Sequence, residues 1–306
     1  MLLPADVREL SQIIHDAHDR DAPLEIVGGG SWHGCGWSSV PDTTCLRIGA
    51  LTGIVEYVPG DLTLTARAGT TLAEIDDTTA SHAQWCPVLP WGENAATLGA
   101  VFATATPGPF ERTLGRPRDL ALGLEFVDGT GATVRAGGRV VKNVAGFDLT
   151  RLLVGSWGTL GVITEISVRL RARPAFDETW ALNFDWDDET AQPARHTFER
   201  GPYAPLALRR LEAADRRALG LAEDRTILAR IGGNASFVAA ARQALRTLGD
   251  ADSCDASIWD RYRSIHAGAG TLQFSTALSS PLARRVKRQF DPKHILNRGL
   301  FGEEAG

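Results

Sequence analysis

One short stretch, residues 155–161 (GSWGTLG), constrains the fold of this chain more than any other. Three of its seven residues are glycine, and without a Cβ the backbone can lie very close to a ligand or to another segment. Residues 149–153 before it carry leucines spaced like one helical face, and residues 162–168 after it form an apolar, β-rich run. The pattern predicts a helix, a glycine turn and a buried strand, which together aim backbone N–H groups at an anion or a ring edge. A tight turn between two core elements is the alternative.

A second glycine segment lies near the amino terminus. Residues 24–27 (LEIV) read as a strand and lead directly into three glycines at 28–30. The dinucleotide fingerprint G-x-G-x-x-G is not met, because His33 occupies the third glycine position. No clear helix follows, and the next strand is expected at residues 45–48. This order excludes a Rossmann unit and leaves two alternatives, phosphate binding and a glycine-rich surface loop.

The sequence between the two glycine segments predicts paired strands and a capped helix. Thr71 and Glu74 have capping-box spacing, so a helix is expected to begin there. Residues 128–131 (DGTG) are a hairpin turn signal. The strands expected in this region cover residues 54–58, 62–67, 120–127 and 132–135.

The longest specific signal is the string KNVAGFDLTRLLVGSWGTLGVITE, residues 142–165. It resembles the PCMH-type FAD-binding domain of the vanillyl-alcohol-oxidase superfamily, and within it looks most like the FAD-binding subunit of glycolate oxidase complexes. Phe147 stands where tyrosine is usual in that family, so a hydroxyl is lost and the ring is kept. Lys142 stands out because only three of the 32 basic residues are lysines.

The resemblance implies an α+β fold in which two small α+β subdomains hold FAD between them. It covers residues 1–173 nearly end to end. Residues 174–289 are expected to form a small α/β cap domain, with strands at 206–211 and 226–231 and a helix at 235–248. Residues 290–306 resemble a terminal segment that returns to the FAD domain in relatives and brings Asn297 near the flavin.

The resemblance also implies which residues contact FAD, and the glycine segments form most of the set. Arg112 joins the set as a phosphate partner, although a solvated loop face is the alternative for this arginine and its neighbours. Gly161→Val is expected to impair FAD binding more than folding. The implied cofactor residues are Val27, Gly28, Gly29, Gly30, Ser31, Trp32, Gly34, Ala96, Thr97, Leu98, Gly99, Arg112, Gly155, Gly158, Thr159, Gly161 and Val162.

A catalytic base is harder to find. Oxidation of a hydroxy acid needs a base for the hydroxyl proton, usually histidine, and a cation for the carboxylate. The cap contains no H-x-H pair and no histidine–acid cluster in sequence. His266, followed by a glycine-rich turn, is the best single candidate, with a structural histidine as the alternative. No C-x-x-C pair occurs, so no metal site is predicted, and Cys86 is read as a buried structural cysteine.

Two functions follow from these observations. In the first, the chain is the FAD-binding subunit of a glycolate oxidase or dehydrogenase complex. It works there with a larger flavoprotein subunit and an iron–sulfur subunit, and takes part in electron transfer from 2-hydroxy acid oxidation. In the second, it is a stand-alone FAD-dependent oxidoreductase acting on a small 2-hydroxy acid or alcohol. The short, histidine-poor cap favours the first.

Composition limits the partners and the compartment. The net charge of −5 gives no indication of nucleic-acid binding. The start MLLPADVREL lacks the apolar run of a signal peptide, and no window approaches 18 apolar residues, so no transmembrane segment is predicted. We expect a cytoplasmic protein that reaches the inner face of the membrane through its partners.

We predict that FAD is bound without a covalent link. Some members of the family attach FAD through a histidine directly after the glycine run, and this chain has Ser31 there. Acid precipitation of the purified protein should therefore release all of the yellow colour into the supernatant. Flavin that stays with the pellet would contradict the prediction.

Overall fold

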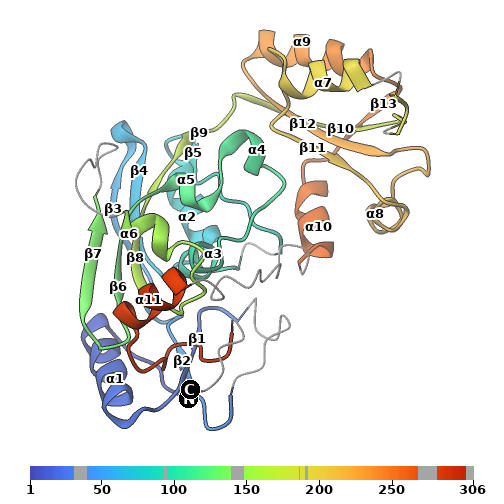
Figure 1. Ribbon diagram of the computed structural model, residues 1–306. Helices are drawn as coiled ribbons and strands as arrows, with labels where there is room; N and C mark the ends of the chain where they lie inside the picture. Colours follow the sequence, from blue (N-terminus) through green and yellow to red (C-terminus); the bar gives the residue numbers. More distant parts are fainter. Residues whose placement is uncertain are drawn as a thin grey trace.

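The chain forms two parts, each built around its own sheet (Figure 1). The computed structural model describes residues 1–30, 40–92, 95–138, 148–185, 187–189, 192–267 and 281–300. The chain returns to the larger part after the smaller one: helix α11 (Pro281–Phe290), which follows the smaller part in sequence, lies beside the larger sheet. In the described ranges, no helix is both long and apolar enough to cross a membrane.

The larger part is built on a five-stranded antiparallel sheet. Its central strand follows the predicted glycine turn and is buried at six of its eight positions, which explains its almost continuously apolar sequence. The predicted strands of this region are confirmed. Across the sheet the order is β3 (Ile54–Val58), β4 (Thr63–Arg67), β8 (Val162–Arg169), β6 (Ala121–Val127) and β7 (Thr133–Gly137).

The amino-terminal segment adds a parallel strand pair to this part. Strand β1 (Leu24–Val27) pairs in parallel with β2 (Thr44–Arg47), so the predicted order of strand, glycine run and strand is confirmed. Helix α1 (Val7–Arg20) begins at Asp6, whose side chain accepts a hydrogen bond from Glu9 N at 2.8 Å. One contiguous hydrophobic cluster joins this segment to the five-stranded sheet.

Short helices connect and cover these strands. The predicted capping box is present at the start of α2 (Leu72–Ala80), where Thr71 N donates to the Glu74 carboxylate at 2.7 Å and Glu74 N to the Thr71 hydroxyl at 3.2 Å. Strand β5 (Gln84–Trp85) pairs with β9 (Arg171–Ala172). The remaining helical segments are η1 (Pro59–Asp61), α3 (Leu98–Thr104), α4 (Glu111–Leu114), α5 (Pro117–Leu120) and α6 (Leu149–Leu153).

The smaller part, which we call the cap, is a four-stranded sheet with helices on both faces. Helices α7 (Gln192–Arg200) and α9 (Ala235–Arg246) cover one face, and α8 (Ala213–Leu219) and α10 (Ile258–Ile265) lie on the other (Figure 1). In order the strands are β11 (Ala207–Arg210), β12 (Ile227–Gly233), β10 (Phe176–Leu182) and β13 (Ala251–Cys254).

The cap departs from the expected pattern in two respects. Strands and helices alternate along the chain as predicted, but every strand pair in the sheet is antiparallel. Two strands were not foreseen, and one of them, β10, lies in the interior of the sheet. Its sequence FDETWAL begins with acidic residues, which are unusual in a strand, and the Arg230 and Arg242 side chains neutralise them. The domain boundaries after residues 173 and 289 stay predictions.

An aromatic cluster joins the two parts. Trp85 and Phe110 of the larger part pack in one buried cluster with Trp259 and Tyr262 of α10. The rings of Phe110 and Trp259 have centroids 5.3 Å apart, and the Trp259 indole donates to the Thr179 hydroxyl at 2.9 Å. The cap sheet is therefore packed on the larger part through its α8/α10 face.

Candidate cofactor site

Two of the predicted glycine segments meet at the start of helix α3. A Cβ on Gly28 would lie 2.8 Å from the Thr97 hydroxyl and 3.3 Å from the Ala100 Cβ, so only glycine allows this approach. Thr97 is the residue that caps α3, and its hydroxyl accepts from Ala100 N at 3.4 Å. Gly29 also lies against Thr97. The end of β1 and the cap of α3 thus lie against each other and form one cradle; that this cradle binds the diphosphate of FAD stays a prediction.

The third glycine segment runs along the other end of α3. Gly155 N donates to Phe102 O at 3.0 Å and Trp157 N to Ala103 O at 2.8 Å. Gly155 and Gly158 have φ values of +85° and +72°, which glycine adopts without strain. We call residues 155–159 the glycine turn. Helix α3 therefore holds all three predicted cofactor segments together.

Asn297 links the glycine turn directly to β1. Its side-chain oxygen accepts from Ile26 N at 2.7 Å, and its side-chain nitrogen donates to Trp157 O at 2.6 Å. The resemblance implied a position near the flavin for this residue, and the structure brings it to two backbone segments of the predicted site. Glycine at these positions lets the backbone segments of the predicted site converge, because a Cβ on Gly28 or Gly158 would collide with Thr97 or Asn297.

Several predicted contact residues have a packing role. Leu98 and Val162 lie in the main hydrophobic cluster, and a Cβ on Gly99 would stand 2.6 Å from the Ala68 Cβ. At Gly161 a Cβ would meet the Phe126 ring at 2.5 Å and Val127 O at 3.0 Å. The backbone φ angle of Gly161 is not positive, so its conformation alone does not require glycine. The expectation that Gly161→Val acts mainly on FAD binding therefore needs correction, because the missing Cβ faces the core.

Arg112 is engaged with the cap. Its guanidinium lies 3.6 Å from the carboxylate of Glu199 on α7. The other predicted residues of the FAD-binding part are Val27 and Ala96, which are buried, and Thr159, whose hydroxyl donates to Ser156 O at 2.6 Å. Other predictions fall outside the residues that the structure describes, namely Ser31, Trp32, Gly34, His33, Lys142 and Phe147.

Cys86, which precedes the Ala96–Gly99 segment in sequence, is buried, as predicted. Cys86 is 7% exposed, and burial raises the pKa of its thiol to about 11. At neutral pH the thiol is protonated and therefore a poor nucleophile. This agrees with the reading of Cys86 as a structural residue.

His266 has a partner that the sequence did not reveal. Its Nε2 lies 2.9 Å from Oδ1 of Asp215, a buried residue at the start of α8. The imidazole ring also contacts two aromatic rings, Tyr262 at 4.7 Å and Trp91 at 5.5 Å between centroids. Asp215 is 51 residues away in sequence, so no local motif could have indicated this histidine–acid pair.

The surroundings of His266 are polar and partly desolvated. The Arg209 guanidinium lies 5.3 Å from the centre of the Trp91 ring, and burial lowers the pKa of this arginine. Burial, together with the nearby Asp215 charge, raises the pKa of Tyr262 to about 12. The side chains of Arg209, Tyr262 and His266 thus surround the Trp91 indole, where the cap meets the larger part.

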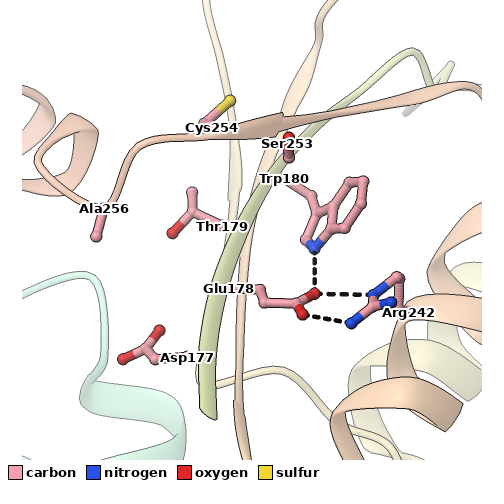
Figure 2. A pocket seen from close by; sticks show the side chains of 8 residues that line it. All are labelled: Asp177, Glu178, Thr179, Trp180, Arg242, Ser253, Cys254 and Ala256. Carbon is pink, nitrogen blue, oxygen red and sulfur yellow. Dashed lines mark hydrogen bonds and ion pairs between the residues drawn. The ribbon is translucent and has the colours of Figure 1, made fainter.

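A separate surface pocket of about 380 Å³ lies on the cap sheet, where β13 diverges from β10 (Figure 2). In this view the Trp180 indole and the Arg242 guanidinium both point at the Glu178 carboxylate. Asp177 is held by Arg230 at 2.8 Å. Because arginines already engage both carboxylates, the pocket offers no free charge to a ligand.

The family comparison and the fold agree on the class of protein. Residues 1–137 match the family described as FAD binding domain. Alkyldihydroxyacetonephosphate synthase superposes with a TM-score of 0.74 over 97% of this chain and 76% of that one, at 16% identity. Substrate-bound p-cresol methylhydroxylase gives a TM-score of 0.66 over 88% and 62%, at 12% identity. Residues 1–137 thus match an FAD-binding domain, and the predicted α+β fold class and the predicted cofactor, FAD, are confirmed.

Curated proteins with similar sequences include subunits of glycolate oxidase and a D-lactate dehydrogenase. Glycolate oxidase subunit GlcE of Escherichia coli is 41% identical over 167 residues, which are 54% of this chain and 47% of that protein. D-lactate dehydrogenase of Archaeoglobus fulgidus is 33% identical over 55% and 37% of the two chains. Glycolate oxidase subunit GlcD of Bacillus subtilis is 30% identical over 63% and 41%. The chain spans less than half the length of these curated relatives.

We predict that Gly161→Val lowers stability and leaves the flavin content of the folded protein unchanged. The added side chain must displace the Phe126 ring, and overpacking of this kind costs about 1–3 kcal/mol. The thermal midpoint of the cofactor-free chain should fall, whereas Gly60→Ala, with open space around its Cβ position, should leave the midpoint nearly unchanged. A stable Gly161→Val variant that binds no FAD would contradict this prediction.

Proposed function

We propose that this chain is the FAD-binding subunit of a glycolate oxidase (glycolate dehydrogenase) complex. In this proposal it is an FAD-dependent oxidoreductase that holds FAD non-covalently and takes part in electron transfer from 2-hydroxy acid oxidation. The observation that supports it most is the cradle formed by β1, α3 and the glycine turn, in a chain 41% identical over 167 residues to the E. coli subunit GlcE.

The partners belong to the same proposal. A larger flavoprotein subunit would receive the substrate, and an iron–sulfur subunit would carry electrons onward. The similarity to relatives named as two different glycolate oxidase subunits supports a multi-subunit assembly. We also propose a cytoplasmic location, with contact to the inner face of the membrane made by the partners.

The residues of this chain would bind and orient the cofactor. Bound FAD supplies the hydride and electron chemistry, and the protein positions and tunes it. Gly28 and Gly29 allow the end of β1 to lie against Thr97, and the glycine turn lies along the same helix, α3. These groups hold a cofactor in place but remove no proton from a substrate. That is what a subunit devoted to electron transfer requires.

A specific observation favours a second candidate, a stand-alone oxidoreductase acting on a small 2-hydroxy acid or alcohol. His266 is hydrogen-bonded to the buried Asp215, and a buried carboxylate in this position orients the imidazole ring. Such a pair is suited to accept a hydroxyl proton. The Arg209 guanidinium lies over the Trp91 ring, which also contacts His266, and could bind the carboxylate of a 2-hydroxy acid.

Anaerobic reduction of the flavin separates the two candidates. We predict that glycolate or D-lactate does not bleach the isolated, FAD-loaded chain, and that bleaching requires the reconstituted complex. A positioned base typically contributes about 10²–10⁴-fold to the rate, so its loss is measurable. Rapid bleaching that is lost in His266→Ala and kept in His196→Ala, which alters an exposed cap histidine, would overturn the subunit proposal in favour of the second candidate.

A further inference from the structure

A lysine is completely buried behind the glycine turn. Lys287 lies on α11 with 0% of its surface exposed, although lysine is almost never fully buried unless it is paired. Its ammonium donates to Thr159 O at 2.7 Å, to the Asp291 carboxylate at 2.7 Å and to Leu296 O at 3.2 Å. All three donors of the ammonium are used, and one of them fixes the end of the glycine turn.

Asp291 completes this buried pair and shapes the segment after it. It is also 0% exposed, and its carboxylate accepts from Ile295 N at 3.0 Å and Leu296 N at 2.9 Å. A Cβ on Gly129 would lie 2.5 Å from this carboxylate, so the β6–β7 turn packs tightly against it. The carboxylate therefore sets the path of the chain toward Asn297.

The same segment then attaches to β1. Leu24 N donates to Ile295 O at 2.8 Å and Asn297 N to Leu24 O at 2.9 Å. The Asn297 side chain adds its bonds to Ile26 N and Trp157 O. Consequently the segment is bonded on one side to the strand that enters the predicted diphosphate loop, and on the other to the glycine turn.

The glycine turn needs such support because of its backbone conformation. Trp157 has φ +54°, which is uncommon for a residue with a side chain, and Gly158 follows with φ +72°. Asn297 holds Trp157 O and Lys287 holds Thr159 O, one on each side of Gly158. A backbone in this region persists only when its surroundings fix it.

We propose that residues 287–297, here named the clamp, form a further component of the FAD site, beside β1, α3 and the glycine turn. Asn297 and Lys287 are positioning residues that keep the glycine turn in its FAD-binding conformation before the cofactor arrives. By linkage, FAD binding and the order of the clamp stabilise each other. The proposal rests on FAD binding alone and holds for either function proposed above.

The sharpest variant changes one atom of the clamp. Asn297→Asp keeps an acceptor for Ile26 N and places an oxygen opposite Trp157 O, so only the bond to the glycine turn is lost. The matched control is Arg298→Ala. This neighbour ties the same segment to Asp21 at the end of α1, at 2.8 Å, and its other hydrogen bonds go to His294 O and Lys293 O rather than to the turn.

We expect Asn297→Asp to raise the dissociation constant for FAD at least tenfold in a fluorescence titration of the full chain, and to change the visible absorption of the bound flavin. Arg298→Ala should stay within twofold of the parent chain. If both variants lower the thermal midpoint and leave FAD affinity and spectrum unchanged, the clamp is only a structural tether and the proposal is wrong.

Hydrogen exchange on the parent chain tests the linkage without any substitution. FAD should slow amide exchange in residues 153–160 and in residues 287–300 together, while α9 of the cap remains unchanged as the internal control. Slowed exchange in the glycine turn with no change in residues 287–300 would overturn the proposal, even if the Asn297 variant fails to fold.

Discussion

The side-chain amide of Asn297 is the interaction on which the arrangement of the cofactor site depends most. One amide satisfies a backbone donor of β1, Ile26 N, and a backbone acceptor of the glycine turn, Trp157 O. The buried Lys287–Asp291 pair then fixes the direction from which this amide arrives. Burying such a pair is costly unless every donor and acceptor is used, and here the neighbouring backbone supplies the partners. A local site built from glycine thus depends on a segment more than a hundred residues away.

The parts of this site that the sequence predicted are those with local signals. Glycine runs after strands, the Thr71–Glu74 capping box and the apolar run of β8 each follow from neighbouring residues. The role of Lys287 could not be found in this way, because its i, i+4 spacing from Asp291 is that of an ordinary ion pair on a basic helix. The acceptor that it holds in the glycine turn, Thr159 O, is 128 residues away in sequence. Gly161 shows a constraint that the motif did not reveal, since the position of its missing Cβ is occupied by the Phe126 ring; its contact with the cofactor stays a prediction.

The cap shows the same limit of local reasoning. Strand β10 is interior, although no strand was predicted there, and the arginines that neutralise Asp177 and Glu178 lie on β12 and α9. The histidines were judged by whether an acid or a second histidine stood close in sequence. His266 failed that test, yet the fold supplies Asp215 from another helix. Pairing across the fold, rather than spacing along the chain, decides whether a histidine has a carboxylate partner.

One loop connects the cap to the cofactor site. Arg263 of α10 donates to Pro90 O at 2.7 Å, and Gly92 N donates back to Arg263 O at 3.0 Å. The same stretch of chain continues to Thr97, which caps α3 beside Gly28. Because α3 also carries the glycine turn, a displacement of α10 would reach the cofactor segments through a few covalent and hydrogen-bonded links. The cap is therefore linked by hydrogen bonds to the stretch of chain that leads to Thr97 and the start of α3.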